Sequence, residues 1–152
     1  MIAIKVGVGQ SYTRQIFTFI ERSLWQAFSK SCEIVAKMHK ELQGNIIKEK
    51  AKNSSGRLYD SIMVQKVEDR QGMIRYDVIV TAPYAAWVQW GRDAPIGLPY
   101  SKSGGKDFSK SKFSGHYYAT EATKLITDNN LHIEIIRSQI FNELKKLGGR
   151  YA

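Results

Sequence analysis

The side chains best suited to catalysis or metal binding are scattered along this chain. His39, His116 and His132 stand far apart in the sequence, and none has the spacing to a cysteine or carboxylate that zinc sites use. The single cysteine, Cys32, falls within an apolar helical pattern, which favours a packed thiol over a nucleophile. The sequence therefore predicts no metal site and no thiol catalysis.

The polar group that most resembles a site is the trio Arg57, Asp60 and Ser61. Such a trio in a turn is typical of capping and local hydrogen bonding. The chain also lacks a nucleophile elbow, a phosphate-binding loop and a dinucleotide-binding motif. We therefore predict no catalytic residue and no cofactor. The alternative is an enzyme whose site these motifs do not describe.

Composition predicts one globular domain over residues 1–152. Hydrophobic residues make up 43% of the chain and charged residues 24%, which supplies a core but falls short of two full domains. No apolar run is long enough to span a bilayer, and the first residues lack the apolar segment of a signal peptide. We expect a protein made and kept in a cytoplasm, without membrane contact or internal disulfides.

The formal net charge of +9 attracts anionic partners such as nucleic acid or an acidic protein surface. Lysine and arginine are spread along the chain rather than clustered, and no nucleic-acid-binding motif accompanies them. A solvated or partner-facing surface is the main interpretation of this charge. Direct nucleic-acid binding is the alternative.

A long helix is predicted over residues 13–50. Its apolar residues recur at spacings that fit one face, with charged residues between them. The members of this face are Ile16, Ile20, Leu24, Phe28, Val35, Leu42 and Ile46. Gly44 and Asn45 are expected to end or weaken the helix. Part of so long a stripe must pack on a sheet or on a neighbouring subunit.

A short helical turn and a β-hairpin are expected next. Leu58 and Ile62 stand one helical turn apart. Residues 61–67 and 73–81 have the composition of two antiparallel strands, and the polar residues 68–72 are expected to form the turn between them. The sheet is therefore small.

Another short helix is expected between Pro83 and Gly91, two residues that suit the start and the end of a helix. Three side chains share one face with Gly91: Tyr84, Trp87 and Val88. We interpret this aromatic face as core. Trp90 lies on another face, where its ring must pack on the sheet, on another element or on a partner.

Residues 92–115 are expected to form a flexible loop within the single domain. Its lysines alternate with serine and glycine: Lys102, Lys106, Lys110 and Lys112. Two interpretations stay open, an arm that becomes ordered on contact with a neighbour and a solvated insertion.

The last third is predicted to be helical, around residues 118–126 and 133–147. The second of these helices has an apolar stripe made of Ile133, Ile136, Ile140, Leu144 and Leu147, and Gly148 and Gly149 are expected to close it. The expected fold class is therefore α+β, with a long N-terminal helix and C-terminal helices packed on a small antiparallel β-sheet.

Two segments resemble signatures of a known family. The first segment supplies Ser55, Gly56, Leu58, Ser61 and Ile62, and the second supplies Tyr84, Ala85, Trp87, Val88, Trp90 and Gly91. Together with the order of the elements, they make residues 10–100 similar to the head–tail joining and tail-completion (neck) proteins of tailed bacteriophages, of the coliphage HK-ninety-seven gene-ten type. Ser55, Gln89 and Arg92 depart from the threonine, acid and threonine usual in that family, which leaves open any polar role at residue 89.

The resemblance implies a structural virion protein of a phage or prophage, assembled in the bacterial host cytoplasm. Such proteins join the head to the tail or complete the tail, and many copies form a ring. The implied partners are other neck, connector or tail proteins and further copies of the chain. We expect Tyr84, Trp87 and Trp90 to form a platform beside the sheet, and the loop that begins at Arg92 to meet neighbouring subunits, together with the outer face of the first helix.

The core interpretation of Trp87 predicts that Trp87→Ala lowers the free energy of unfolding by about 3–5 kcal/mol, because a large ring is removed from a packed site. Thermal melting of the two purified proteins measures this difference. An unchanged melting temperature would contradict the assignment of this ring to the core.

Overall fold

The computed structural model describes residues 10–51, 56–70, 73–91 and 115–151, and within them the side chains of residues 18–149. The elements are α1 (Gln10–Lys50), α2 (Arg57–Asp60), β1 (Ile62–Arg70), β2 (Met73–Val80), α3 (Ala85–Trp90), α4 (Tyr118–Asp128) and α5 (Leu131–Tyr151). The expected α+β class, with its long N-terminal helix, C-terminal helices and small antiparallel sheet, is confirmed. Apart from Gly115, the loop expected at residues 92–115 lies outside the described residues.

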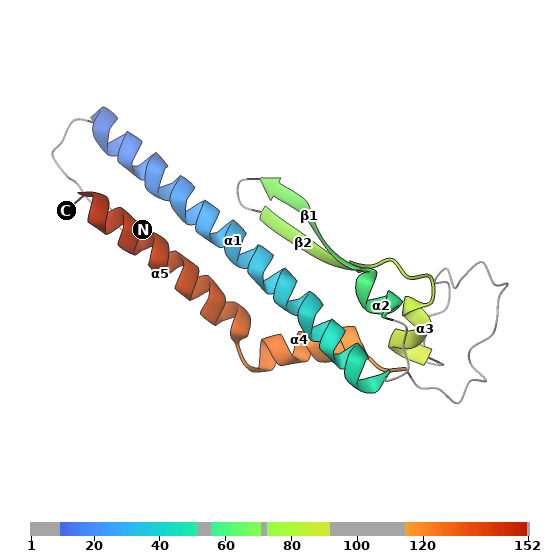
Figure 1. Ribbon diagram of the computed structural model, residues 1–152. Coiled ribbons are helices and arrows are strands. Elements are labelled where there is room, and N and C mark those ends of the chain that lie inside the picture. The colour runs from blue at the N-terminus through green and yellow to red at the C-terminus, as the bar shows by residue number, and fades with distance from the viewer. Residues whose placement is uncertain (1–9, 52–55, 71–72, 92–114, 152) are drawn as a thin grey trace.

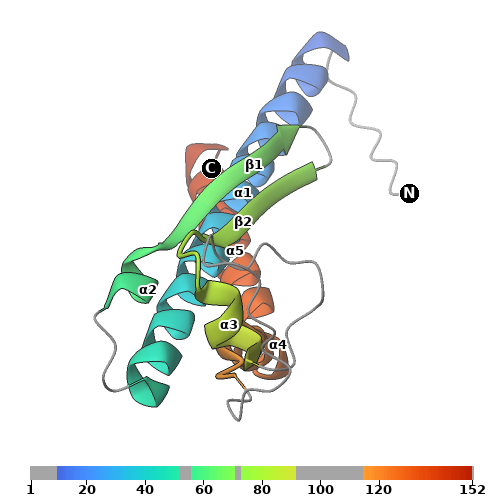
Figure 2. The same cartoon turned by 90° about the vertical axis from the view of Figure 1, so that its right-hand side faces the viewer.

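Helix α1 is the axis on which the other elements pack. The hairpin of β1 and β2 lies along one side of α1, and α5 runs antiparallel to α1 along another side (Figure 1). The view at right angles agrees, with the hairpin in front of α1 and α5 behind it (Figure 2). Because α1 is shared by both layers, its sequence has to provide apolar or small residues on more than one face.

Helix α1 continues through Gly44 and Asn45 to Lys50, so these two residues do not end it. Gly44 is buried, and a Cβ atom at this position would lie 2.2 Å from Cε2 of Tyr59. Lys48, one helical turn after Gly44, places its Nζ 4.4 Å from the centroid of the same Tyr59 ring. The glycine therefore allows α2 to approach α1 closely.

The hairpin is longer than the sequence pattern indicates. Strand β1 extends to Arg70, so residues 68–70 belong to the strand and not to the turn. Ile62 pairs with Val80 at one end of the register, and an irregularity falls between Lys66 and Glu68. The bulge changes which side chains face α1 near the tip, which a strict alternation could not predict.

Two polar contacts tie the distal half of the hairpin to α1. Lys66 Nζ lies 3.5 Å from Ser29 Oγ, and the Trp25 indole N–H donates to Asp69 at 3.3 Å. Lys66 also pairs with Asp69. These exposed contacts set the direction of the hairpin, while its stability comes from the apolar end.

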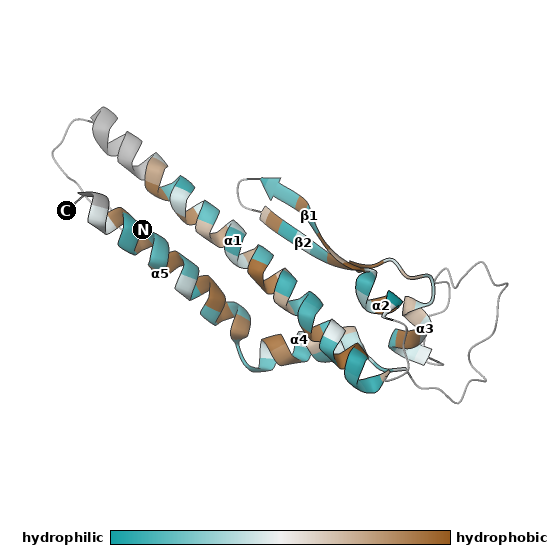
Figure 3. Ribbon diagram, in the orientation of Figure 1, coloured by the Kyte–Doolittle hydropathy of each residue, from teal (hydrophilic) through white to brown (hydrophobic). Residues whose placement is uncertain are grey.

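The core lies where the hairpin leaves α2 and meets the last turns of α1. Ile62 is fully buried and Ile47 is 1% exposed. The cluster consists of Ile46, Ile47, Leu58, Ile62, Ala85, Tyr118 and Ala122. Hydrophobic residues gather at this base of the hairpin (Figure 3). The core thus joins residues from five elements at one end of the molecule.

The later helices differ from their predicted limits. Gly91 is the residue after α3 as expected, but α3 begins at Ala85, with Pro83 in the preceding turn. Helix α5 continues past Gly148 and Gly149 to Tyr151. In its predicted apolar stripe Leu147 is buried, whereas Ile133 and Leu144 are exposed.

Two glycine-to-alanine changes separate helix propensity from packing. Gly148→Ala is expected to stabilise the protein by about 0.5–1 kcal/mol, because alanine favours the helix and nothing lies within 4 Å of the added Cβ. Gly44→Ala gains the same propensity but collides with the Tyr59 ring, so we expect a net loss of about 1–3 kcal/mol. Urea unfolding measures both changes. A stabilised Gly44→Ala variant would contradict the close contact between α1 and α2.

Candidate functional site

The two segments that resemble family signatures meet in the same core. Leu58 and Ile62 from the first segment are buried beside Ala85 from the second, and Val88 packs against this cluster. The segments are separated by the whole hairpin in sequence. Leu58, Ile62, Ala85 and Val88 therefore belong to one packing unit.

The first segment makes the corner between α2 and β1. Gly56 has a left-handed backbone with φ of 78°, which glycine adopts without steric cost, and its carbonyl accepts the N–H of Asp60 at 3.1 Å. Ser61 Oγ donates to the carbonyl of Leu58 at 2.7 Å. The Ser61 carbonyl accepts the backbone N–H of Thr81 at 3.1 Å. Ser61 thus ends the helical turn and begins the sheet, while Ser55 lies outside the described residues.

In the second segment the side chain of Gln89 is buried, whereas the aromatic rings are exposed or half-buried. Gln89 is 3% exposed and Ala85 is buried one turn before it, whereas Tyr84 is 39% exposed. Trp87 and Trp90 are half-buried. The core interpretation was therefore wrong for Tyr84, and a half-buried Trp87 places the expected loss for Trp87→Ala at the lower end of its range.

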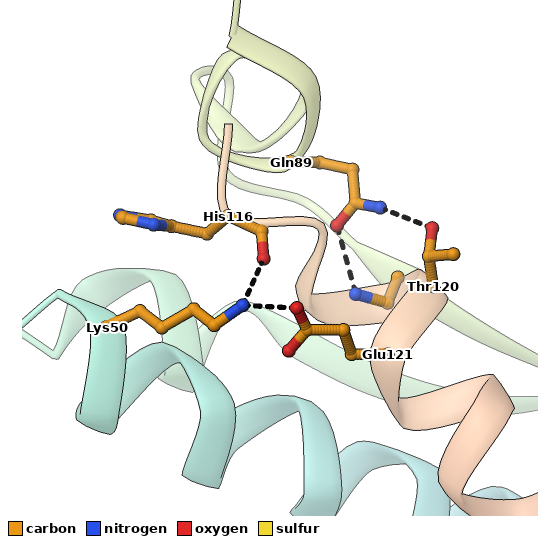
Figure 4. A network of polar contacts seen from close by, with 6 residues as sticks. Lys50, Gln89, His116, Thr120 and Glu121 are labelled. Atoms are coloured by element: carbon orange, nitrogen blue, oxygen red, sulfur yellow. Dashed lines mark hydrogen bonds and ion pairs between the residues drawn. The ribbon is translucent and has the colours of Figure 1, made fainter. Parts of the chain in front are cut away.

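The Gln89 side chain links α3 to the beginning of α4. Its Oε1 accepts the backbone N–H of Ala119 at 2.9 Å, and its Nε2 donates to Thr120 Oγ1 at 3.1 Å (Figure 4). The amide thus satisfies one of the backbone N–H groups that the first turn of a helix leaves without a partner. Sequence reasoning treated Gln89 only as a departure from the family, although its i, i+4 spacing from Ala85 was a signal of a shared face.

The backbone makes the reverse connection. The N–H groups of His116 and Tyr117 donate to the carbonyls of Val88 and Gln89 at 2.8 and 2.9 Å. At Gly115, where φ is +85°, a Cβ would lie 2.5 Å from the carbonyl carbon of Trp90. Only glycine fits so close to the Trp90 backbone. Gly115 therefore lets the chain pass beside the end of α3 immediately before α4 begins.

Lys50 joins the end of α1 to this connection. Its Nζ donates to the carbonyl of His116 at 3.1 Å and pairs with the Glu121 carboxylate (Figure 4). Burial, and secondarily the Lys50 charge, lowers the pKa of His116. We call the set Lys50, Gln89, His116, Thr120 and Glu121 the α3–α4 junction. Its polar groups hold α1, α3 and α4 together.

Two further side chains connect α4 to the rest of the molecule. Tyr118 is buried, which raises its pKa to about 12, and its hydroxyl lies 3.4 Å from the carbonyl of Ala85. The Nε2 atom of His39 lies 2.9 Å from Thr123 Oγ1. The Nδ1 atom of the same ring lies 2.8 Å from Gln43 Nε2. Because Gln43 Nε2 is a donor, Nδ1 must accept and Nε2 must carry the proton. Burial lowers the pKa of His39, which favours this neutral form.

No group of three metal-ligating side chains comes together in the part of the chain that the structure describes. Over the same residues, no helix is long and apolar enough to cross a membrane. The residues predicted to contact neighbouring subunits lie outside the described residues: Arg92, Lys102, Lys106, Lys110 and Lys112.

Large apolar side chains remain exposed on two separate elements. On the hairpin these are Met63, Val67 and Met73, and on α5 they are Ile133, Phe141 and Leu144. Phe141 is 56% exposed, with Lys145 Nζ 4.6 Å from its ring centroid. Phe141 and Leu144 stand one helical turn apart, whereas Met63 and Met73 lie near opposite ends of the hairpin register. Large exposed apolar side chains are typical of surfaces that bind another protein. These two surfaces, here called the hairpin surface and the α5 surface, are candidates for subunit contacts.

Replacing Gln89 tests the α3–α4 junction. Gln89→Met keeps the side-chain volume but leaves the Ala119 N–H without its acceptor, so we expect the free energy of unfolding to fall by about 1–3 kcal/mol. Gln89→Glu keeps an acceptor at the first turn of α4, where negative charge is favourable, and should lose less. Urea denaturation at neutral pH compares the three proteins. Equal stability of wild type and Gln89→Met would mean that the amide does not link the helices.

Comparisons with protein-family models, with curated proteins and with solved structures found no match to this chain. A functional assignment therefore depends on the residues and surfaces described above.

Proposed function

We propose that this protein is a structural subunit of a tailed-phage virion that joins head to tail or completes the tail, by assembling into a ring. It acts without catalysis and without a cofactor. It is made in the bacterial host cytoplasm and becomes part of the neck or tail. Its partners are further copies of itself and neighbouring connector or tail proteins.

The observation that carries this proposal is the presence of two different apolar surfaces on one small subunit. The hairpin and α5, which carry these side chains, run along different sides of α1 (Figure 1). A contact between unlike surfaces repeats from copy to copy and produces a closed ring when the rotation permits. A monomer gains nothing from keeping Phe141, Leu144 and Met63 in water, whereas a ring subunit can bury such side chains.

The packing of the two signature segments supports the same proposal. Leu58, Ile62 and Ala85 are core residues, and Gln89 is part of the α3–α4 junction. The resemblance therefore concerns the frame that holds the hairpin to α1. Such a frame suits a protein whose role is to present rigid surfaces to neighbours.

The alternative, nucleic-acid binding, draws on the net charge of +9. Within the described residues, many cations are already paired with acids: Lys37, Lys50, Lys66, Arg70, Arg75 and Lys146. Phosphate binding needs cations that can release counterions from the nucleic acid. The described surface therefore supports nucleic-acid binding less than the net charge of the whole chain would suggest.

Disruption of the gene in the parent phage, followed by electron microscopy, tests the proposed function. We expect DNA-filled heads and separate tails that fail to join, or tails of abnormal length. Wild-type protein supplied from a plasmid is the control and should restore joined particles. Normal, infectious virions from the disrupted phage would reject the neck and tail role, and DNA binding near physiological salt would then be measured next.

A further inference from the structure

A groove of about 780 Å³ runs beside β2. The strand lines it with six consecutive residues, Ile74 to Ile79, and α1 forms its floor with Cys32, Val35, Ala36 and His39. Side chains of a strand alternate between its two faces, so a groove over one face would be lined by every second residue. A lining of consecutive residues means that the groove follows the edge of the strand.

That edge of β2 has no strand partner among the described residues, because their sheet contains only β1 and β2. An unpaired edge presents backbone N–H and C=O groups that can pair with an added strand. The four floor residues stand at i, i+3, i+4 and i+7 and so form one face of α1, and His132 and Ile136 of α5 complete the lining. The groove therefore suits an extended segment with apolar side chains on one face.

The chain contains a segment with this pattern immediately before α1. In residues 2–8, IAIKVGV, a β-branched residue occupies every second position: Ile2, Ile4, Val6 and Val8. Ala3, Lys5 and Gly7 stand between them. Alternation of β-branched with small or charged residues is typical of a strand that covers an apolar surface with one face.

This segment is too short to lie on the floor of the groove in its own molecule. Helix α1 rises about 1.5 Å per residue, so Cys32 lies about 33 Å from Gln10, and His39 about 43 Å. The eight residues from Ile2 to Gln10 span at most about 29 Å when fully extended. Residues 2–8 can therefore cover this floor only in another copy.

We propose that residues 2–8 of one copy add as a third strand to the free edge of β2 in the next copy. Ile2, Ile4, Val6 and Val8 then lie over the floor formed by α1. Lys5 falls on the opposite face of the extended sheet, which carries the ion pair of Arg75 with Asp77. Donor and acceptor surfaces differ, so the contact repeats head to tail. The biological role of this strand contact rests on the proposed assembly of a ring, whereas the geometry of the contact does not.

A cysteine scan of residues 2–8 tests this contact in the full-length chain. Cys32 is the only cysteine and lies on the floor, so a cysteine introduced on the inward face of the added strand can form a disulfide with Cys32 of another copy. Each of the seven single variants is oxidised mildly at the same high protein concentration. Burial raises the pKa of the Cys32 thiol, so the reaction is run at alkaline pH.

We expect disulfide-linked dimers and larger species to form several-fold more at residues 2, 4, 6 or 8 than at the neighbouring residues 3, 5 and 7. Lys5→Cys is the matched control for Val6→Cys, since it is adjacent in sequence but points away from the floor. Excess peptide of residues 1–9 should lower the yield, whereas a peptide with the same residues in a non-alternating order should not. Absence of inter-chain disulfides, yields without a period of two, or disulfides within single chains would overturn the proposal.

The outcome is separable from that of the gene disruption. Unjoined heads and tails in the disrupted phage, together with a scan that lacks the period of two, would reject only the strand contact. A periodic scan with normal virions from the disrupted phage would reject the neck role and leave the contact between copies in place.

Discussion

The structure depends on the burial of Ile47 and Ile62 at the end of α1. A two-stranded hairpin is marginal in water, so this one depends on the helix beneath it. Each buried isoleucine contributes about 1.5–3 kcal/mol. Near the tip, by contrast, the hairpin is held by exposed contacts such as that between Trp25 and Asp69, and exposed polar pairs are weak. Stability is therefore expected to fall along the hairpin from its base to its tip.

The α3–α4 junction shows how α3 and α4 are joined although residues 92–114 separate them in the sequence. Residues 92–114 leave α3 after Gly91 and return at Gly115, where backbone hydrogen bonds join the two helices directly. The entropic cost of closing a loop grows only slowly with its length. Since Gln89 and Lys50 hold the start of α4 in place, the packing of α3 and α4 is expected to depend only weakly on how many residues lie between them.

Periodicity predicted the order and type of the main helices and strands, although several limits differ, and Leu58 and Ile62, placed one helical turn apart, are both buried. It failed where a residue's role is decided by a distant neighbour. Gly44 was expected to end or weaken the helix; the helix does not end there, and the sequence does not reveal that Tyr59 packs on this glycine. Gln89 was overlooked because its partners, Ala119 and Thr120, lie beyond a long insertion. Apolar periodicity in a sequence shows which residues share one face of a helix or strand, but it does not show which faces pack together.

The same limit applies to Ile133 and Leu144, which follow the apolar period of α5 yet remain exposed. Helix α1, which also carries the hairpin, leaves these two side chains exposed. Among the described residues, one edge of β2 likewise has no strand partner, and it lies beside the α1 residues that line the groove. Under the proposed contact, another copy supplies the missing strand, so residues that are surplus in the monomer become interior in the assembly. Assembly and the completion of the fold would then be one event, and a subunit with a small core could still form a rigid ring.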